Sequence, residues 1–120
     1  SVIQALNIPT VDNGKVDPYV LVEVREPGKD DGRVFSSKRT SAQKNASDAL
    51  WNETVQLHAK EEFELTLAIF DKNMFKRDEE VARIDLGPIS GLTMDRQQIV
   101  EAGNVQLTYS VTLHLALSMG

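Results

Sequence analysis

The segment Asn7–Val24, NIPTVDNGKVDPYVLVEV, organises this 120-residue chain. It is a polar loop with two aspartates, Asp12 and Asp17, that leads directly into a predicted strand. The strand is expected because Tyr19–Val24 is rich in β-branched and aromatic residues. Pro18 stands at the first strand position, where a missing backbone donor does little harm. The loop carboxylates are therefore held at one end of a rigid element, where proteins often carry functional residues.

Alternating apolar residues predict further strands along the chain. We expect strands over Val2–Leu6, Pro18–Glu26, Val34–Ala42, Trp51–His58, Phe63–Phe70, Glu80–Leu86 and Val105–Leu117, the last as one bent strand or as two that meet near Ser110. One short helix is expected near residues 94–102, with Thr93 as its cap and Gly103 at its end. Seven or eight short strands with turns between them predict an all-β antiparallel sandwich.

Composition excludes several classes of protein and of site. A length of 120 residues with 41% apolar content supports one domain with one core, and we expect residues 1–120 to be a single domain cut from a larger protein. The absence of cysteine excludes disulfides and cysteine-held metals. A net charge of −5 argues against nucleic acid as a partner. The sequence has no apolar run near the ~20 residues of a membrane-spanning helix and no visible signal peptide.

Two acidic loops predict a metal site. Asp12 and Asp17 lie in the first loop, and the loop 70–81 adds Asp71, Asn73, Asp78 and Glu79. If both loops leave the same end of the sandwich, their carboxylates repel each other unless a cation neutralises them. Calcium is the natural candidate because it takes about 6–8 oxygen ligands, and neither loop has a histidine for zinc, copper or iron. The alternative is that these aspartates only cap and turn the loops.

The order of these motifs resembles the C2 domain, the calcium- and lipid-binding sandwich of many membrane-targeted proteins. The resemblance covers about residues 2–92 and rests on NIPTVDNGKVDPYV (7–20), WNET (51–54), LAIFDKN (67–73) and DEEVA (78–82). It implies an eight-stranded antiparallel Greek-key β-sandwich whose calcium loops, at one end, meet lipid headgroups. The family has two circularly permuted forms, and this chain favours the one whose extra strand is C-terminal.

Carried over by position, the resemblance assigns the calcium ligands. The two first-loop aspartates match the family's first-loop ligands, and Asp71 matches the first ligand of the family's third loop. The next family aspartate is replaced by Asn73, and the closing one aligns with Glu79, or with Asp78 after a one-residue shift. Asn73 offers a neutral oxygen and Glu79 is one methylene longer, so both replacements lower the expected calcium affinity.

The tip of the third loop is predicted to contact lipid. Two large apolar residues stand there beside two cations, in the order Met74, Phe75, Lys76 and Arg77. At an interface the apolar pair enters and the cations meet phosphates, with Val11 and Val16 as a smaller apolar contact from the first loop. Calcium would act as an electrostatic switch, because it inverts the local charge of the acidic loops. The alternative is that Phe75 folds back onto the sandwich.

A basic patch is the second candidate lipid site. In the family, lysines on the strand that corresponds to FSSKRTSAQK (35–44) bind phosphoinositide headgroups, and Lys38, Arg39 and Lys44 match that role here. The neighbouring strand has Leu21 where the family usually has a lysine, and adjacent strand residues point to opposite faces. A solvated polar strand is therefore the favoured interpretation.

These observations predict a cytoplasmic module that binds anionic phospholipid membranes under calcium control and targets its parent protein there. The alternative is a calcium-independent module that binds a protein partner or another domain of its parent, which Asn73 and Glu79 favour. The domain itself is not expected to be an enzyme, although its parent can be one. It lacks a nucleophile motif and a phosphate-cradling glycine loop, and His58 and His114 lie in strand patterns.

Overall fold

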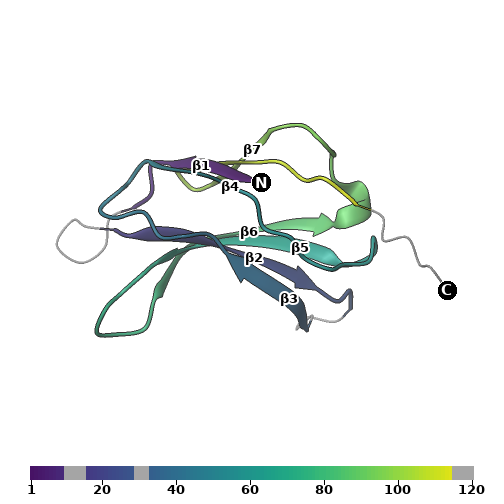
Figure 1. The fold of residues 1–120 in the computed structure, drawn as a ribbon, viewed down its shortest axis with the longest axis horizontal. Helices are drawn as coiled ribbons and strands as arrows, with labels where there is room; N and C mark the ends of the chain where they lie inside the picture. Colours follow the sequence, from purple (N-terminus) through teal and green to yellow (C-terminus); the bar gives the residue numbers. More distant parts are fainter. Residues whose placement is uncertain (10–15, 29–32, 115–120) are drawn as a thin grey trace.

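The computed structural model describes residues 1–9, 16–28 and 33–114, and these form two antiparallel four-stranded sheets packed face to face (Figure 1). The elements are β1 (Val2–Leu6), β2 (Pro18–Arg25), β3 (Val34–Arg39), β4 (Ala49–Glu53), β5 (Glu64–Asp71), β6 (Glu79–Pro88), the 3₁₀ turn η1 (Ile89–Gly91), β7 (Gln98–Ala102) and β8 (Val105–Tyr109). The predicted eight-stranded antiparallel sandwich is confirmed.

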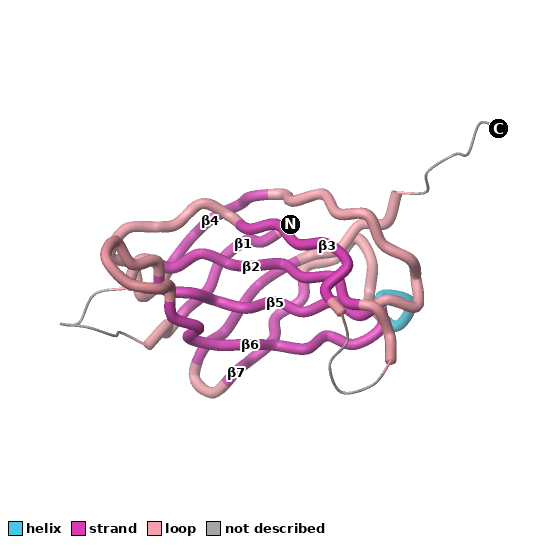
Figure 2. Tube along the Cα trace, turned by 90° about the horizontal axis from the view of Figure 1, so that it is seen from below, coloured by secondary structure: helices cyan, strands magenta, loops and turns pink. Residues whose placement is uncertain are grey.

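β2 begins, β5 ends and β6 begins at the same end of their sheet, because Pro18 pairs with Asp71 and Asp71 pairs with Glu79. One sheet has the order β4-β1-β8-β7 and the other β3-β2-β5-β6, as Figure 2 shows for the second sheet. β2 lies between β3 and β5, so it is the central strand that its apolar sequence predicts. β8 lies between β1 and β7, which agrees with the permuted form whose extra strand is C-terminal.

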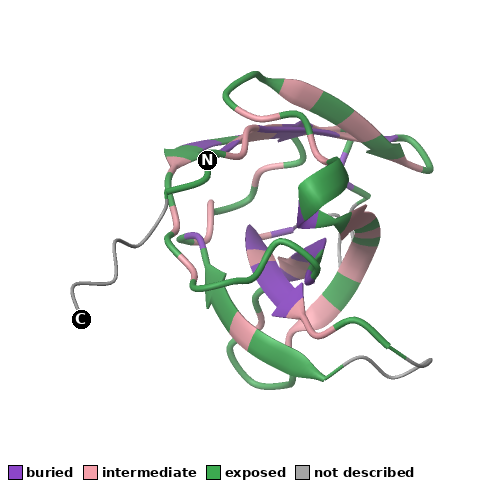
Figure 3. Cartoon of the chain, turned by 90° about the vertical axis from the view of Figure 1, so that its right-hand side faces the viewer, coloured by how far each residue is buried: buried purple, intermediate pink, exposed green. Residues whose placement is uncertain are grey.

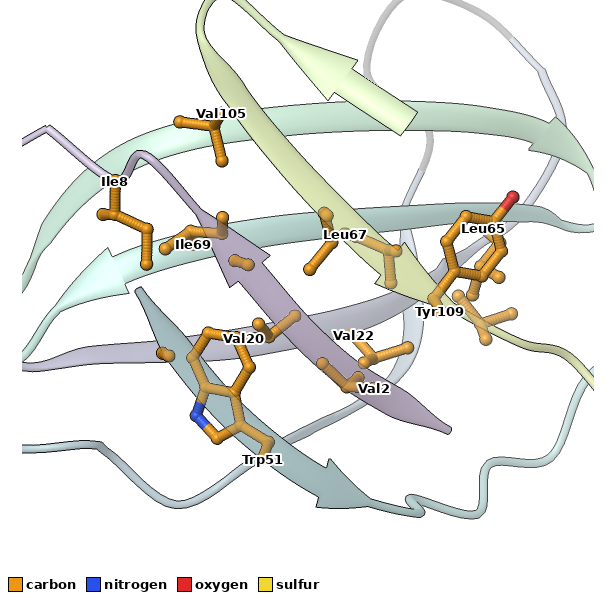
Figure 4. Packing of buried hydrophobic residues seen from close by; sticks show 14 of the residues in the cluster. Val2, Ile8, Val20, Val22, Trp51, Leu65, Leu67, Ile69, Val105 and Tyr109 are labelled. Carbon is orange, nitrogen blue, oxygen red and sulfur yellow. The ribbon is translucent and has the colours of Figure 1, made fainter. Parts of the chain in front are cut away.

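The inner faces of the sheets enclose one hydrophobic core. Val20 of β2, Ile69 of β5 and Leu107 of β8 are completely buried, and Figure 4 shows labelled core residues of both sheets between the layers. Viewed along the long axis, most buried residues lie on the strands, and exposed residues dominate the loops at the near end (Figure 3). Because side chains alternate along a strand, the face of β2 opposite Val20 carries Tyr19 and Glu23 on the outside of the sandwich.

The predicted helix near 94–102 is wrong. Residues 98–102 form β7, which pairs with β8, and the helical residues within the described ranges are the single turn Ile89–Gly91. Ala102 pairs with Val105 across the two-residue turn Gly103-Asn104, in which Gly103 has a φ of 62°. Gly-Asn between two apolar runs is a hairpin signal, and the ladder with β8 outweighs a weak helical tendency.

Three predicted strands end three or more residues earlier than expected. Val34–Ala42 stops at Arg39, Trp51–His58 is the strand Ala49–Glu53, and Val105–Leu117 stops at Tyr109, with residues 115–117 outside the described part. After β3 the Ser41 carbonyl accepts a hydrogen bond from the Trp51 indole N–H at 2.9 Å, which turns the chain toward β4. In β4 itself, Asn52 has a φ of 48°, which bends the strand.

Candidate metal and membrane site

Asp17 and Asp71 are brought together at the end where β2 begins and β5 ends. Pro18 pairs with Asp71 across the β2–β5 ladder, so the two loops meet these strands at the same end of the sheet, as the sequence predicts. The Asp17 N–H donates to Asp71 Oδ1 at 2.9 Å, and the Lys72 N–H donates to the Asp17 carbonyl at 3.0 Å. Asp71 is only 3% exposed, so its carboxylate is fixed in place by the sheet.

The loop between β3 and β4 joins the same cluster, which sequence reasoning missed. The Asn45 N–H donates to Asp17 Oδ1 at 2.7 Å, and the Ala46 N–H donates to the Val16 carbonyl at 2.9 Å. Asn45 has a φ of 51°, a conformation that asparagine adopts more readily than most residues. The sequence signal that could have identified this contact is the asparagine in a polar loop. The Asn45 backbone lies beside Asp17, a candidate metal ligand.

Asp78 takes part in a different set of contacts. Its Oδ2 accepts a 2.6 Å hydrogen bond from the Tyr19 hydroxyl, and its Oδ1 accepts a 2.9 Å bond from the Asn73 N–H. These bonds, with the nearby Arg39 guanidinium, lower the pKa of Asp78 below its usual range. Burial raises the pKa of Tyr19, and the bond to the Asp78 carboxylate raises it further.

The remaining predicted ligands are also bonded within the protein. Glu79 lies opposite Asp71 in the β5–β6 ladder, but its Oε1 pairs with Lys76 Nζ at 2.8 Å. The side-chain amide of Asn73 donates to the Arg77 carbonyl at 2.9 Å. Among the described residues no three carboxylate, histidine or cysteine side chains form a group that could hold a metal ion. Asp12, predicted as a ligand, and Val11, predicted to contact lipid, lie outside those residues.

The third-loop tip is directed into solvent. Met74 is 90% exposed and Phe75 is 96% exposed, so Phe75 does not fold back onto the sandwich. Lys76 and Arg77 beside them are exposed as well. The expected apolar contact from Val16 is wrong, because that residue is 1% exposed and belongs to the core. Val16 is buried because it directly precedes β2, the central strand, and packs into the core with it.

The basic patch is only partly formed. Lys38, Arg39 and Lys44 are all exposed, and Arg39 lies over the Tyr19 ring, 4.8 Å from its centroid. Adjacent residues of β3 pair with different β2 positions, Lys38 with Val22 and Arg39 with Leu21, so they point to opposite faces as predicted. The outer face therefore presents Arg39 without its neighbour.

Acidic residues balance the cations on that outer face. Glu23 is 5% exposed and accepts hydrogen bonds from Arg25 at 3.1 Å and from Arg83 at 2.9 Å. Arg83 in turn pairs with Glu80 at 2.6 Å. The centre of this face is thus a mixed network of charges, which supports the expectation of a solvated polar surface more than that of a continuous cationic site.

A profile of the C2 domain matches residues 1–102, so the chain belongs to the C2 domain family. Domains of this family typically act as regulatory modules that target lipid membranes. A search of curated proteins finds no match to this sequence. In the described part of the chain, no helix has the length and apolar character needed to span a membrane.

Solved structures share the fold at low sequence identity. Human GIVD cytosolic phospholipase A2, solved with methyl gamma-linolenyl fluorophosphonate and terbium chloride, matches with a TM-score of 0.71 and 20% identity, over 89% of this chain and 15% of the phospholipase. A C2 domain of plant extended synaptotagmin 1 matches with a TM-score of 0.65 and 18% identity, over 93% of this chain and 92% of that domain. This chain thus spans about 15% of the phospholipase's length.

Proposed function

We propose that this domain is a calcium-regulated module that binds anionic phospholipid membranes from the cytoplasm and brings its parent protein to them. The exposed third-loop tip is the observation that carries this proposal. Met74 and Phe75 stay 90% and 96% exposed in the folded domain, directly beyond the loop base formed by Asp71. Large apolar side chains gain about 1.5–3 kcal/mol each from full burial, so a lipid surface is a favourable place for them.

The residues at the loop base fit a hard cation. Asp17 and Asp71 carry carboxylates, which is the donor type that calcium prefers, and the bond from the Asp17 N–H to Asp71 Oδ1 holds the two residues next to each other. Asp12, Asn73 and Glu79 are the further candidates to hold the ion. A bound calcium ion would supply positive charge at this end of the domain. The chain's own residues would then present Phe75 and its neighbouring cations to a surface that the bare acidic loops repel.

Sedimentation with phosphatidylserine-containing vesicles tests the proposal. We expect wild-type protein to pellet in calcium and to stay in solution with chelator, and we expect Asp17→Asn/Asp71→Asn to stay in solution in both. Asparagine keeps an Oδ1 that can accept the Asp17 N–H bond, so the loop base should still fold. Asp85→Asn/Asp95→Asn removes two charges as well, from exposed positions in β6 and in the segment between η1 and β7, and it should behave as wild type.

Two other outcomes would redirect the proposal. Pelleting that chelator does not affect would contradict calcium control and favour phosphoinositide binding through Lys38, Arg39 and Lys44. No pelleting under either condition would favour a calcium-independent module for a protein partner or another domain of the parent. That second function has its own support, because the Asp78 and Glu79 carboxylates are already bonded to donors of the protein itself.

A further inference from the structure

The Asp78 carboxylate closes the loop between β5 and β6. Asp78 accepts the Asn73 N–H at one oxygen, which draws together the two ends of the segment 73–78. The Asn73 side chain adds a second bond across the loop, to the Arg77 carbonyl at 2.9 Å. Residues 74–77 are thereby held in a turn, which leaves the Met74 and Phe75 side chains in solvent.

The other oxygen of Asp78 ties this turn to the outer face of the sheet. Tyr19 of β2 donates its hydroxyl at 2.6 Å, across 59 residues of sequence. The Tyr19 ring is itself fixed on two sides: it stacks on Phe70, with centroids 5.6 Å apart and planes 10° apart, and Arg39 lies over it at 4.8 Å. The anchor of the loop is therefore an immobilised aromatic ring on the central strand.

Arg39 is the weaker partner of Asp78. Its guanidinium lies 3.9 Å from Oδ2, and its side chain is 53% exposed, so solvent screens the pair. The Tyr19 hydroxyl bond is short and made to an ionised acceptor, which is the stronger kind of hydrogen bond. Tyr19 and the Asn73 N–H therefore hold Asp78 more strongly than Arg39 does.

We infer that Asp78 is a positioning residue, held by Tyr19, that pre-orders the third-loop tip for its contact with the membrane and is not itself a cation ligand. Its Oδ2 lies 3.9 Å from the Arg39 guanidinium, whose positive charge would repel a cation at this carboxylate. A tip that is already ordered loses less conformational freedom when it binds. The effect on vesicle binding rests on the proposed function, whereas the effect on the loop does not.

Tyr19→Phe tests the anchor because it removes one hydroxyl and keeps the ring. Asp78→Ala tests the loop closure, and Tyr109→Phe, a hydroxyl removed from a buried tyrosine of β8, is the matched control. By ¹⁵N relaxation we expect the order parameters of residues 74–77 to fall below about 0.6 in both test variants and to be unchanged in the control. Unchanged order in Tyr19→Phe and Asp78→Ala would overturn the inference.

Vesicle and cation titrations on the same variants complete the test. With phosphatidylserine vesicles in calcium, we expect about 10- to 100-fold weaker binding for Tyr19→Phe and Asp78→Ala, the range that corresponds to one lost hydrogen bond to a charged group. In a calcium titration without lipid, the calcium affinity of Asp78→Ala should stay within about twofold of that of wild type. A loss of calcium affinity as large as that of Asp71→Asn would make Asp78 a ligand and overturn the inference. If wild type does not bind vesicles, the proposed function fails while the relaxation measurement still decides the role of Asp78.

Discussion

Replacing Phe75 with alanine should separate membrane binding from folding. The Phe75 side chain is 96% exposed, so folding buries almost none of it and its loss removes almost no packing. We therefore expect Phe75→Ala to change the free energy of unfolding by no more than about 0.5 kcal/mol. In a lipid interface the same ring would leave water, which is worth about 1.5–3 kcal/mol for full burial. At about 1.4 kcal/mol per tenfold, vesicle affinity should fall about 10- to 100-fold.

Phe35→Ala is the matched control, since it removes the same side chain from the start of β3, which pairs with the end of β2 that is far from Pro18 and the acidic loops. Phe35 is 47% exposed, and its ring packs edge-to-face on Phe63 with centroids 5.0 Å apart. Loss of such a pair costs about 0.5–1.5 kcal/mol beyond the area buried, so this variant should be less stable. Its vesicle affinity in calcium should equal that of wild type.

The assay is a vesicle titration in calcium for all three proteins, together with urea unfolding followed by tryptophan fluorescence. The expected pattern is reciprocal: Phe75→Ala loses affinity and keeps stability, while Phe35→Ala loses stability and keeps affinity. Wild-type affinity in Phe75→Ala would refute the entry of the loop tip into lipid. A loss of more than about 1 kcal/mol of stability in Phe75→Ala would refute the exposed placement of the ring.

Two further predictions concern stability. Asn52→Val should lower the free energy of unfolding in urea by about 1–3 kcal/mol, because a β-branched residue is strained at a φ of 48°. Asn52→Gly should stay within about 1 kcal/mol of wild type. Equal stabilities of the two variants would contradict the bend in β4. Burial raises the pKa of Tyr109 above its ordinary value of 10.0, so the unfolded chain releases this proton first. The stabilisation from the protonated Tyr109 is therefore complete below about pH 10 and is lost as the pH rises toward the folded pKa. Between about pH 9 and about pH 11, the thermal stability should fall less for Tyr109→Phe than for wild type.

The sandwich was predictable because its signals are periodic and local. Alternation in Glu64–Asp71 and in Val105–Tyr109 identifies strands whose inward residues are buried, whichever strands they pair with. The segment Gln98–Ala102 was misread because five residues with adjacent Ile99 and Val100 fit a helical turn and a strand about equally well. Pairing with β8 decided between them. Strand ends were missed for a related reason, since Thr40 and Ser41 still look extended while their hydrogen bonds turn the chain toward β4.

The candidate site was likewise predictable only in part. The sequence alone identified the acidic loops, the exposed apolar tip and the family, because these follow from residue types in order along the chain. Only the tertiary structure decided which oxygens meet: Asp71 accepts the Asp17 N–H, Asn45 reaches Asp17 from a third loop, and Asp78 bonds to Tyr19. These contacts span 28 to 59 residues and depend on the register of β2 with β5 and on side-chain direction. A one-residue slip in that register would reverse every side chain of a strand, so no local pattern can specify them.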